Sequence, residues 1–238
     1  IHPEERFRQL LGDVAALSAA TRRLFTLGVV PTRPETGYGY IREGATLPAP
    51  GLDVRAFEVQ RFVEKPDRAT AELYVAGGQH LWNSGIFIWP AALLLEELRF
   101  HTPELAPLLP LLDDGQVDEF FERSPSLTID VGLLERSDRV AVARANFQWD
   151  DVGAWDAVAR TRSADAAGNV AQGDAWLVDA RGCIAWSDDG AVVLFGTEDL
   201  VVVRANGVTL VAPRDRTAEL KKLLEALPER LRQPEERG

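Results

Sequence analysis

The stretch Leu24-Phe25-Thr26-Leu27-Gly28-Val29-Val30 decides how the first part of the chain folds. An apolar run of this length predicts a buried β-strand, and Pro31 ends it because proline cannot donate to a strand ladder. The residues before it predict an amphipathic helix, with apolar side chains at helical spacing: Phe7, Leu10, Leu11 and Val14. A helix followed directly by a buried strand indicates an alternating α/β domain, which the chain is expected to enter partway through.

Further elements extend this α/β pattern along the first two thirds of the chain. We predict strands at residues 55–63, 85–89 and 141–143, and helices at residues 91–99 and 116–123. The pattern therefore assigns residues 1–162 to one α/β layer structure.

The pattern changes after residue 162 to short apolar runs separated by turn residues, which predicts a compact all-β unit at residues 163–238. The expected strands are 175–178, 183–186, 191–195, 200–203 and 208–212. Asp189-Gly190 and Asn206-Gly207 are predicted hairpin turns, because these residue types tolerate positive φ. A last helix, capped by Thr217, is expected to pack a leucine stripe on the β unit or on a second copy of the chain. The stripe comprises Leu220, Leu223, Leu224, Leu227 and Leu231.

The composition is that of a globular protein and argues against several classes of function. Hydrophobic residues make up 46% of the chain, and the net charge of -11 argues against nucleic-acid binding, which needs clustered Lys and Arg. The apolar runs are too short to span a bilayer. Cys183 is the one cysteine, so no internal disulfide can form. We recognise no signal peptide, and cytoplasm is the expected location.

Two short stretches suit a sugar phosphate, and each also has a purely structural interpretation. In Thr36–Ile41, glycines on both sides of a tyrosine would let the backbone approach a ligand, although a hairpin explains the same pattern. In Phe62–Pro66, Glu64 can accept from sugar hydroxyls and Lys65 can pair with a phosphate. Pro66 is expected to hold Lys65 in an extended conformation. The alternative is a solvated charge pair of little energetic weight.

Two later stretches also carry residues suited to this chemistry. In Trp82–Phe87, Asn83 offers a donor and an acceptor, as sugar hydroxyls require, or it makes a turn before a strand. In Trp149–Trp155, Asp150 or Asp151 can reach a magnesium ion that carries phosphate oxygens, or can cap the helix that follows.

In this order, the four stretches resemble the sugar-1-phosphate nucleotidyltransferase family, and they are most similar to its mannose-1-phosphate guanylyltransferases. The resemblance continues through Asp165–Val170 into the β unit. It implies that residues 1–162 form the C-terminal part of a nucleotidyltransferase α/β domain with a Rossmann-like mixed sheet. A small β-rich domain with a terminal helix would follow at residues 163–238. The implied reaction joins GTP to mannose 1-phosphate, giving GDP-mannose and pyrophosphate, with Mg²⁺.

The resemblance also implies a role for each matching residue. Gly39 would offer its backbone to the sugar, Glu64 would hold sugar hydroxyls, and Lys65 would bind the sugar phosphate and act in catalysis. Asn83 would contact the sugar, and Asp151 would bind the metal.

The sequence departs from the family in one large respect. The family's triphosphate loop, roughly Gly-Gly-x-Gly-x-Arg-Leu-x-Pro, does not occur in these 238 residues. We therefore expect an incomplete portion of an enzyme that does not turn over alone. A smaller departure is Ala154, which stands where Ser is usual and is expected to matter little.

Three rival interpretations remain open at this point. The first is a glucose-1-phosphate transferase using UTP or dTTP, because the base-reading residues of the family also do not occur in the sequence. The others are a non-catalytic sugar-phosphate-binding protein and a structural β module. A homodimer through the β unit or the leucine helix is expected on pattern alone.

Overall fold

The computed structural model describes residues 1–152 and 155–232. The chain divides into two compact units, a first unit of Ile1–Trp149 and a second unit of Asp150–Gly238. The predicted domain boundary at residue 162 stays a prediction. Within the described residues, every helix is too short or too polar to cross a membrane.

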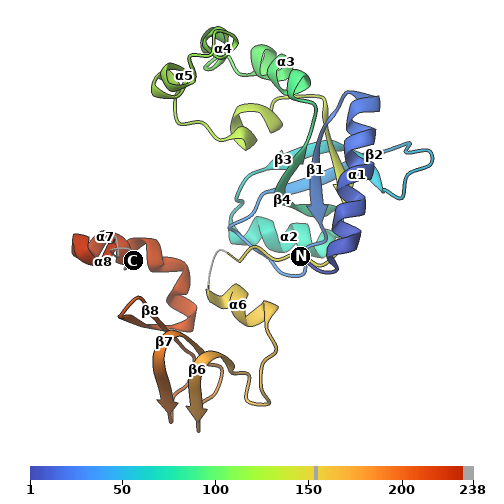
Figure 1. The fold of residues 1–238 in the computed structure, drawn as a ribbon. Helices are drawn as coiled ribbons and strands as arrows, with labels where there is room; N and C mark the ends of the chain where they lie inside the picture. Colours follow the sequence, from blue (N-terminus) through green and yellow to red (C-terminus); the bar gives the residue numbers. More distant parts are fainter. Residues whose placement is uncertain (153–154, 233–238) are drawn as a thin grey trace. The chain divides into compact units, whose positions relative to one another are not determined.

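The first unit is built on a five-stranded mixed sheet (Figure 1). The strands pair in the order β1-β4-β2-β3-β5, and β5 pairs again with β1, so that the order closes on itself. Only the β1–β5 pair is parallel among these strands. This mixed sheet within an α/β unit confirms the predicted fold class. The strands are β1 (Leu24–Val29), β2 (Tyr40–Leu47), β3 (Ala56–Val63), β4 (His80–Ile88) and β5 (Val140–Arg144).

Strand β1 is the predicted buried strand, and all six of its residues are buried. Helix α1 (Glu4–Thr21) packs Leu10, Val14 and Leu17 into the same core as Phe25 and Leu27, which confirms the predicted amphipathic helix. Figure 1 shows α1 and α2 (Arg68–Gly77) beside the sheet, with the other helices of this unit grouped beyond the strand ends. These are α3 (Ala91–His101), α4 (Leu109–Asp113) and α5 (Val117–Arg123). A π-helical turn, Asp130–Leu134, precedes β5.

Two sequence interpretations in this unit were wrong. Residues 82–84 lie inside β4, which begins at His80 because His80–Trp82 pair with β2. The pattern failed there because β4 bulges: Asn83 pairs with Gly28, whereas Phe87 pairs with Thr26, so β4 has two extra residues between these pairs. Residues 36–41 do not form a hairpin, since β1 and β2 each pair with β4 and not with each other.

The second unit contains a four-stranded sheet in the order β6-β7-β8-β9. Pairs β6–β7 and β7–β8 are parallel, and only β8–β9 is antiparallel. The Asn206-Gly207 turn between β8 and β9 is confirmed, with φ of 52° and 73°. The strands are β6 (Val170–Val178), β7 (Ile184–Phe195), β8 (Leu200–Ala205) and β9 (Val208–Pro213).

The Asp189-Gly190 hairpin was wrong, because both residues lie inside β7, which joins two predicted strands into one. The first half of β7 pairs with β6 and β8, and its second half pairs with β6 alone. Parallel neighbours cannot be joined by a tight turn, so the pattern of short runs marks the coils of a parallel sheet and not a series of hairpins.

The predicted C-terminal helix is divided into α7 (Leu220–Ala226) and α8 (Glu229–Arg232). Thr217 does not cap α7, because it lies inside the preceding 3-10 helix, Arg214–Glu219, and its hydroxyl donates to the Arg214 carbonyl at 2.9 Å. Leu223 and Leu224 are exposed. The other helix of this unit is α6 (Trp155–Thr161).

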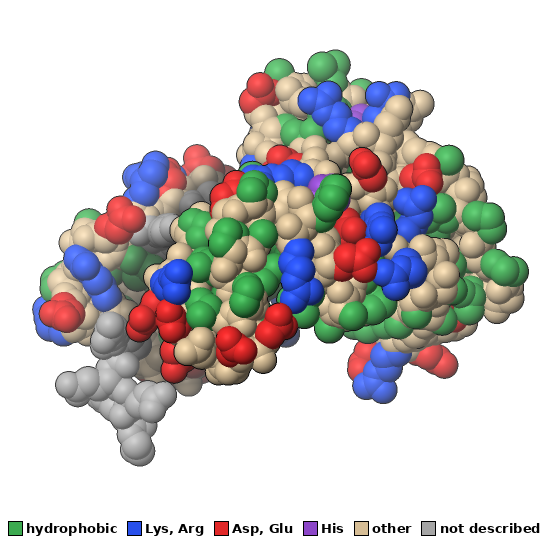
Figure 2. All heavy atoms as spheres, turned by 90° about the horizontal axis from the view of Figure 1, so that it is seen from above, with side chains coloured by type: hydrophobic (Ala, Val, Ile, Leu, Met, Phe, Trp, Pro, Cys, Tyr) green, Lys and Arg blue, Asp and Glu red, His purple; other side chains and the backbone are tan. Residues whose placement is uncertain are grey.

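Acidic, basic and apolar side chains are interspersed over the face drawn in Figure 2.

Candidate functional site

Gly39, Glu64 and Asn83 come together where three neighbouring strands of the first unit meet. Gly39 immediately precedes β2, Glu64 immediately follows β3, and Asn83 lies in β4, which pairs with β2. The Asn83 amide N–H donates to the Gly39 carbonyl at 2.8 Å. A Cβ atom at Gly39 would lie 2.7 Å from Glu64 Oε2 and 3.3 Å from Asn83 Cβ. A larger residue at position 39 would therefore force the Glu64 carboxylate to move.

Lys65 lies beside this cluster, with its Nζ 3.2 Å from Glu64 Oε1. The Lys65 side chain is 63% exposed and that of Glu64 is 22% exposed, so the ammonium group is open to a ligand while the carboxylate is partly enclosed. An exposed pair of this kind contributes little to stability. The pair is thus free to serve a ligand at little cost to the fold.

The extended conformation predicted for Lys65 was wrong, because its φ is +46°. The chain bends sharply at residues 64 and 65, between the end of β3 and the Asp67 cap of α2. A left-handed residue makes this reversal in a short space, whereas an extended residue would continue the strand direction.

The Asn83 carboxamide is held on several sides. Its Oδ1 accepts from the Thr26 hydroxyl at 2.7 Å and from the Gly85 N–H at 3.3 Å, and its Nδ2 donates to Asp130 Oδ1 at 3.0 Å. Thr26 is fully buried in β1. The acceptor side of the amide is therefore engaged by the protein, and a sugar would meet chiefly its donor side.

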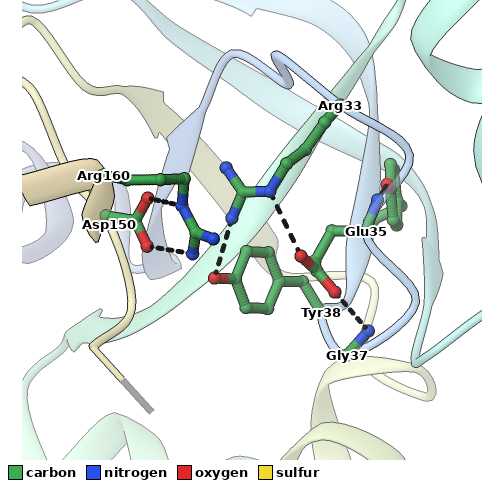
Figure 3. Close-up of polar contacts among 7 residues, drawn as sticks. Arg33, Glu35, Gly37, Tyr38, Asp150 and Arg160 are labelled. Carbon is green, nitrogen blue, oxygen red and sulfur yellow. Dashed lines mark hydrogen bonds and ion pairs between the residues drawn. The ribbon is translucent and has the colours of Figure 1, made fainter. Parts of the chain in front are cut away.

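The loop before Gly39 is tied together by a charged and aromatic cluster (Figure 3). Arg33 pairs with the Glu35 carboxylate at 3.2 Å and donates to the Tyr38 hydroxyl at 3.4 Å. Its guanidinium also lies 4.9 Å from the centre of the Trp82 ring. Since Tyr38 and Trp82 immediately precede Gly39 and Asn83, this cluster orders the backbone on which both site residues sit.

Asp150 and Asp151 differ in whether the protein engages their carboxylates. Arg160 of α6 donates to both carboxylate oxygens of Asp150, at 2.8 and 2.9 Å (Figure 3). Asp151 is exposed, and among residues 1–152 and 155–232 no hydrogen bond or ion pair involves its carboxylate. A single free carboxylate fits Mg²⁺, which keeps several waters and takes one or two protein carboxylates. Ala154 lies outside the described residues.

No cluster of three or more His, Cys, Asp or Glu side chains that could hold a metal occurs within the part of the chain that the structure describes. Asp151 as the metal ligand stays a prediction.

Thr26 and Asp130 belong to this cluster and were not identified from the sequence. Thr26 had a signal that could have been used: it is the one hydroxyl residue within the apolar run of β1, and a buried hydroxyl needs a hydrogen-bond partner. Asp130 had no comparable signal, because it follows Asn83 by 47 residues and belongs to a turn that no periodic pattern marks.

Comparison with known proteins gives two family matches along the chain. The family described as Nucleotidyl transferase matches residues 2–168, and the one described as MannoseP isomerase/GMP-like beta-helix domain matches residues 173–227. The mannose-1-phosphate guanylyltransferase of Escherichia coli K12 is 36% identical over 236 residues, which are 95% of this chain and 49% of that protein. Xanthan biosynthesis protein XanB of Xanthomonas campestris strain B100 is 37% identical over 230 residues, or 93% of this chain and 48% of that protein.

Among solved structures, one described as mannose-1-phosphate geranyltransferase from Thermus thermophilus has a TM-score of 0.80 and 35% identity. The match covers 93% of this chain and 65% of that one. The chain spans about half the length of the curated relatives it matches. Because the first family match covers more than half of the sequence and coincides with the mixed sheet and the Gly39–Glu64–Asn83 cluster, the chain belongs to the nucleotidyl transferase family.

Proposed function

We propose that the chain carries the sugar-phosphate side of a mannose-1-phosphate guanylyltransferase, which forms GDP-mannose and pyrophosphate from GTP and mannose 1-phosphate. The observation that carries the proposal is the meeting of Gly39, Glu64 and Asn83, with the exposed Lys65 ammonium 3.2 Å from the Glu64 carboxylate. Relatives named mannose-1-phosphate guanylyltransferase support the choice of mannose and GTP over glucose with UTP or dTTP.

The proposed chemistry is an in-line displacement, for which the protein supplies position and charge. A phosphate oxygen of mannose 1-phosphate attacks the α-phosphorus of GTP, and the bond from that phosphorus to the pyrophosphate breaks. Lys65 would bind the sugar phosphate and reduce the repulsion between the two anions, while Glu64 would accept hydrogen bonds from sugar hydroxyls. Holding both reactants in line lowers the entropic part of the barrier.

Asp151 is the residue that we propose as the protein ligand of Mg²⁺. Its exposed carboxylate, without a partner among the described residues, supports this choice over Asp150, which is bound by Arg160. When bound, the ion would supply neutralisation of the charge that develops on the leaving pyrophosphate.

The direct test is titration calorimetry of the chain with mannose 1-phosphate, because Glu64 and Lys65 are proposed to bind this substrate. K65A should weaken binding by about tenfold or more, since a hydrogen bond to a charged group contributes about 1.5–3 kcal/mol. K222A, at an exposed lysine on α7, is the matched control and should bind normally. Equal affinity of K65A and the unmodified chain would overturn the proposal, and tighter binding of glucose 1-phosphate would overturn the choice of sugar.

We also propose a cytoplasmic homodimer that forms through the second unit. Four exposed side chains make what we call the β6–β7 apolar patch: Trp176 and Val178 of β6, and Val193 and Phe195 of β7. Trp176 is aligned with Val193 and Val178 with Phe195, so the four side chains are adjacent on one face of the sheet. Contiguous exposed apolar side chains of this kind favour protein contact.

A further inference from the structure

Asp130 contacts Asn83 of the candidate site, and it lies in a turn that is held in place by its own contacts. It begins the π-helical turn Asp130–Leu134 and lies partly exposed. The hydroxyl of Thr102, which is fully buried, donates to the Gly132 carbonyl at 2.8 Å and so anchors the turn to the end of α3. A Cβ atom at Gly132 would lie 2.8 Å from the Leu127 side chain, so the turn is also closely packed. The carboxylate of Asp130 is therefore presented from a fixed backbone.

The partners of Asn83 allow only one orientation of its carboxamide. The Gly85 N–H can only donate, so the atom that it meets at 3.3 Å must be the amide oxygen. The Asp130 carboxylate can only accept when ionised, so the atom that it meets at 3.0 Å must be the amide nitrogen. Both contacts demand the same orientation, and the Thr26 hydroxyl adds a second donor to the oxygen at 2.7 Å.

Two hydrogen-bonding groups remain unused at this point of the site. Among the described residues, Nδ2 of Asn83 donates to Asp130 alone, and the Asp130 carboxylate accepts from Asn83 alone. One N–H of the amide and one oxygen of the carboxylate therefore have no protein partner there. The site thus offers a donor and an acceptor side by side, held in register by the bond between Asn83 and Asp130.

We propose that Asp130 is a specificity residue of the sugar site: it fixes the Asn83 amide and accepts a hydrogen bond from a sugar hydroxyl with its second carboxylate oxygen. A donor beside an acceptor matches two neighbouring hydroxyls of a hexose, one accepting from the Asn83 N–H and the other donating to Asp130. This inference rests on the proposed function, because it assigns a residue to the same ligand. A site built to bond a hydroxyl rejects the analogue that lacks it, since the protein group that the bound ligand covers is left unpaired.

The decisive experiment measures binding of mannose 1-phosphate and its 2-, 3-, 4- and 6-deoxy analogues to the chain and to D130N. The variant keeps an oxygen for Asn83 but loses the charge and the second acceptor. For the unmodified chain, removal of the hydroxyl that donates to Asp130 should weaken binding about tenfold or more, and it is the one analogue whose loss of affinity should depend on Asp130. D130N should bind mannose 1-phosphate and that same deoxy analogue equally. D118N, which removes the same charge from an exposed position on α5, should retain the discrimination.

A purely structural role for Asp130 predicts a different result, in which D130N binds every analogue more weakly by the same factor. That outcome, or full retention of the discrimination in D130N, would overturn the proposal. A second measurement needs no variant at position 130: the Asn83 side-chain N–H resonances, assigned with N83D, should shift when the unmodified chain is saturated with mannose 1-phosphate. Their constancy at saturation would also refute the inference.

The same measurements distinguish failure of the proposed function from failure of the role proposed for Asp130. If the unmodified chain does not bind mannose 1-phosphate, the proposed function fails and Asp130 loses its ligand with it. If the chain binds, K65A weakens binding and D130N leaves the analogue pattern unchanged, only the role of Asp130 is wrong.

Discussion

At the residue scale, a single methyl group added at Gly39 would disturb the proposed sugar-phosphate site. In G39A the new methyl group would lie 2.7 Å from Glu64 Oε2, and the carboxylate must move away. We expect about tenfold weaker binding of mannose 1-phosphate by calorimetry, with little loss of thermal stability because the displaced group is the end of a flexible side chain. G37A, whose methyl group would make an ordinary 3.6 Å contact with Glu35, is the control. Normal binding by G39A would show that the Glu64 carboxylate has no part in the site.

His80 gives the first unit a pH dependence near neutrality. Burial, followed by the positive charges of Arg42 and Arg61, holds the pKa of His80 below its ordinary value of 6.5. The unfolded chain therefore binds a proton near pH 6.5 that the folded chain takes up only at lower pH, so the free energy of unfolding falls as pH drops below about 6.5.

The variant H80F removes this titration and keeps a ring against Tyr74, whose centroid lies 3.9 Å away. Urea unfolding between pH 7.5 and 5.5 should show a smaller loss of stability for H80F than for the unmodified chain. H2F, at an exposed histidine, should keep the original slope. Parallel curves for H80F and the unmodified chain would contradict this account.

Single residues also show how far the sequence could locate the site. Glu64, Lys65 and Asn83 could be named as candidates because a carboxylate, an ammonium and an amide beside apolar strands suit a sugar phosphate, and their roles stay a prediction. Their meeting at Gly39 depends on the pairing of β2 with β3 and β4, which no local pattern specifies. Asp130 could not be found for the same reason, since its partner is 47 residues away.

At the element scale, Gly12 of helix α1 lies at a position where the fold can accommodate a side chain. Gly12 is exposed, and a Cβ atom there would meet nothing within 4 Å among the described residues. G12A should raise the free energy of unfolding by about 0.5–1 kcal/mol, because alanine loses less conformational entropy in a helix. G115A has equally open space but a φ of +73°, and should lower stability by roughly 1 kcal/mol. Chemical denaturation that gave both changes the same sign would refute the distinction.

The elements predicted correctly are those whose signal is local. Buried β1 and amphipathic α1 follow from a continuous apolar run and from helical spacing, respectively. The start of β4 and the length of β7 were missed because bulges interrupt the alternation, so that one strand reads as a loop or as two strands. The hairpin at Asn206-Gly207 and the absence of one at Asp189-Gly190 show that the same residue types serve a turn or a bend within a strand.

At the scale of the whole molecule, the change of pattern along the chain predicted two parts, and the structure likewise divides into two compact units. Each unit has a hydrophobic core of its own. The sequence could not predict the surface that a second copy would use. Which apolar side chains are exposed depends on how the parallel strands of the second unit pair.

The β6–β7 apolar patch leads to a prediction about assembly. Sedimentation velocity should show a dimer for the unmodified chain and a monomer for F195E, because a carboxylate in an apolar contact is strongly disfavoured. V117E, at an exposed apolar residue of α5, should remain a dimer. F195E should still bind mannose 1-phosphate normally, since Gly39, Glu64, Lys65 and Asn83 belong to the first unit. A monomeric unmodified chain would remove the homodimer from the proposal.

The closed strand order of the first unit has a consequence for aggregation. Each of its five strands is paired on both sides, whereas among residues 1–152 and 155–232 the strands β6 and β9 of the second unit are each paired on one side. A strand with a free side can template cross-β growth by another polypeptide, and β6 also exposes Trp176 and Val178. Under stress, fibril nucleation should therefore begin at β6, while the strands that carry the proposed sugar-phosphate site stay protected until their own sheet opens.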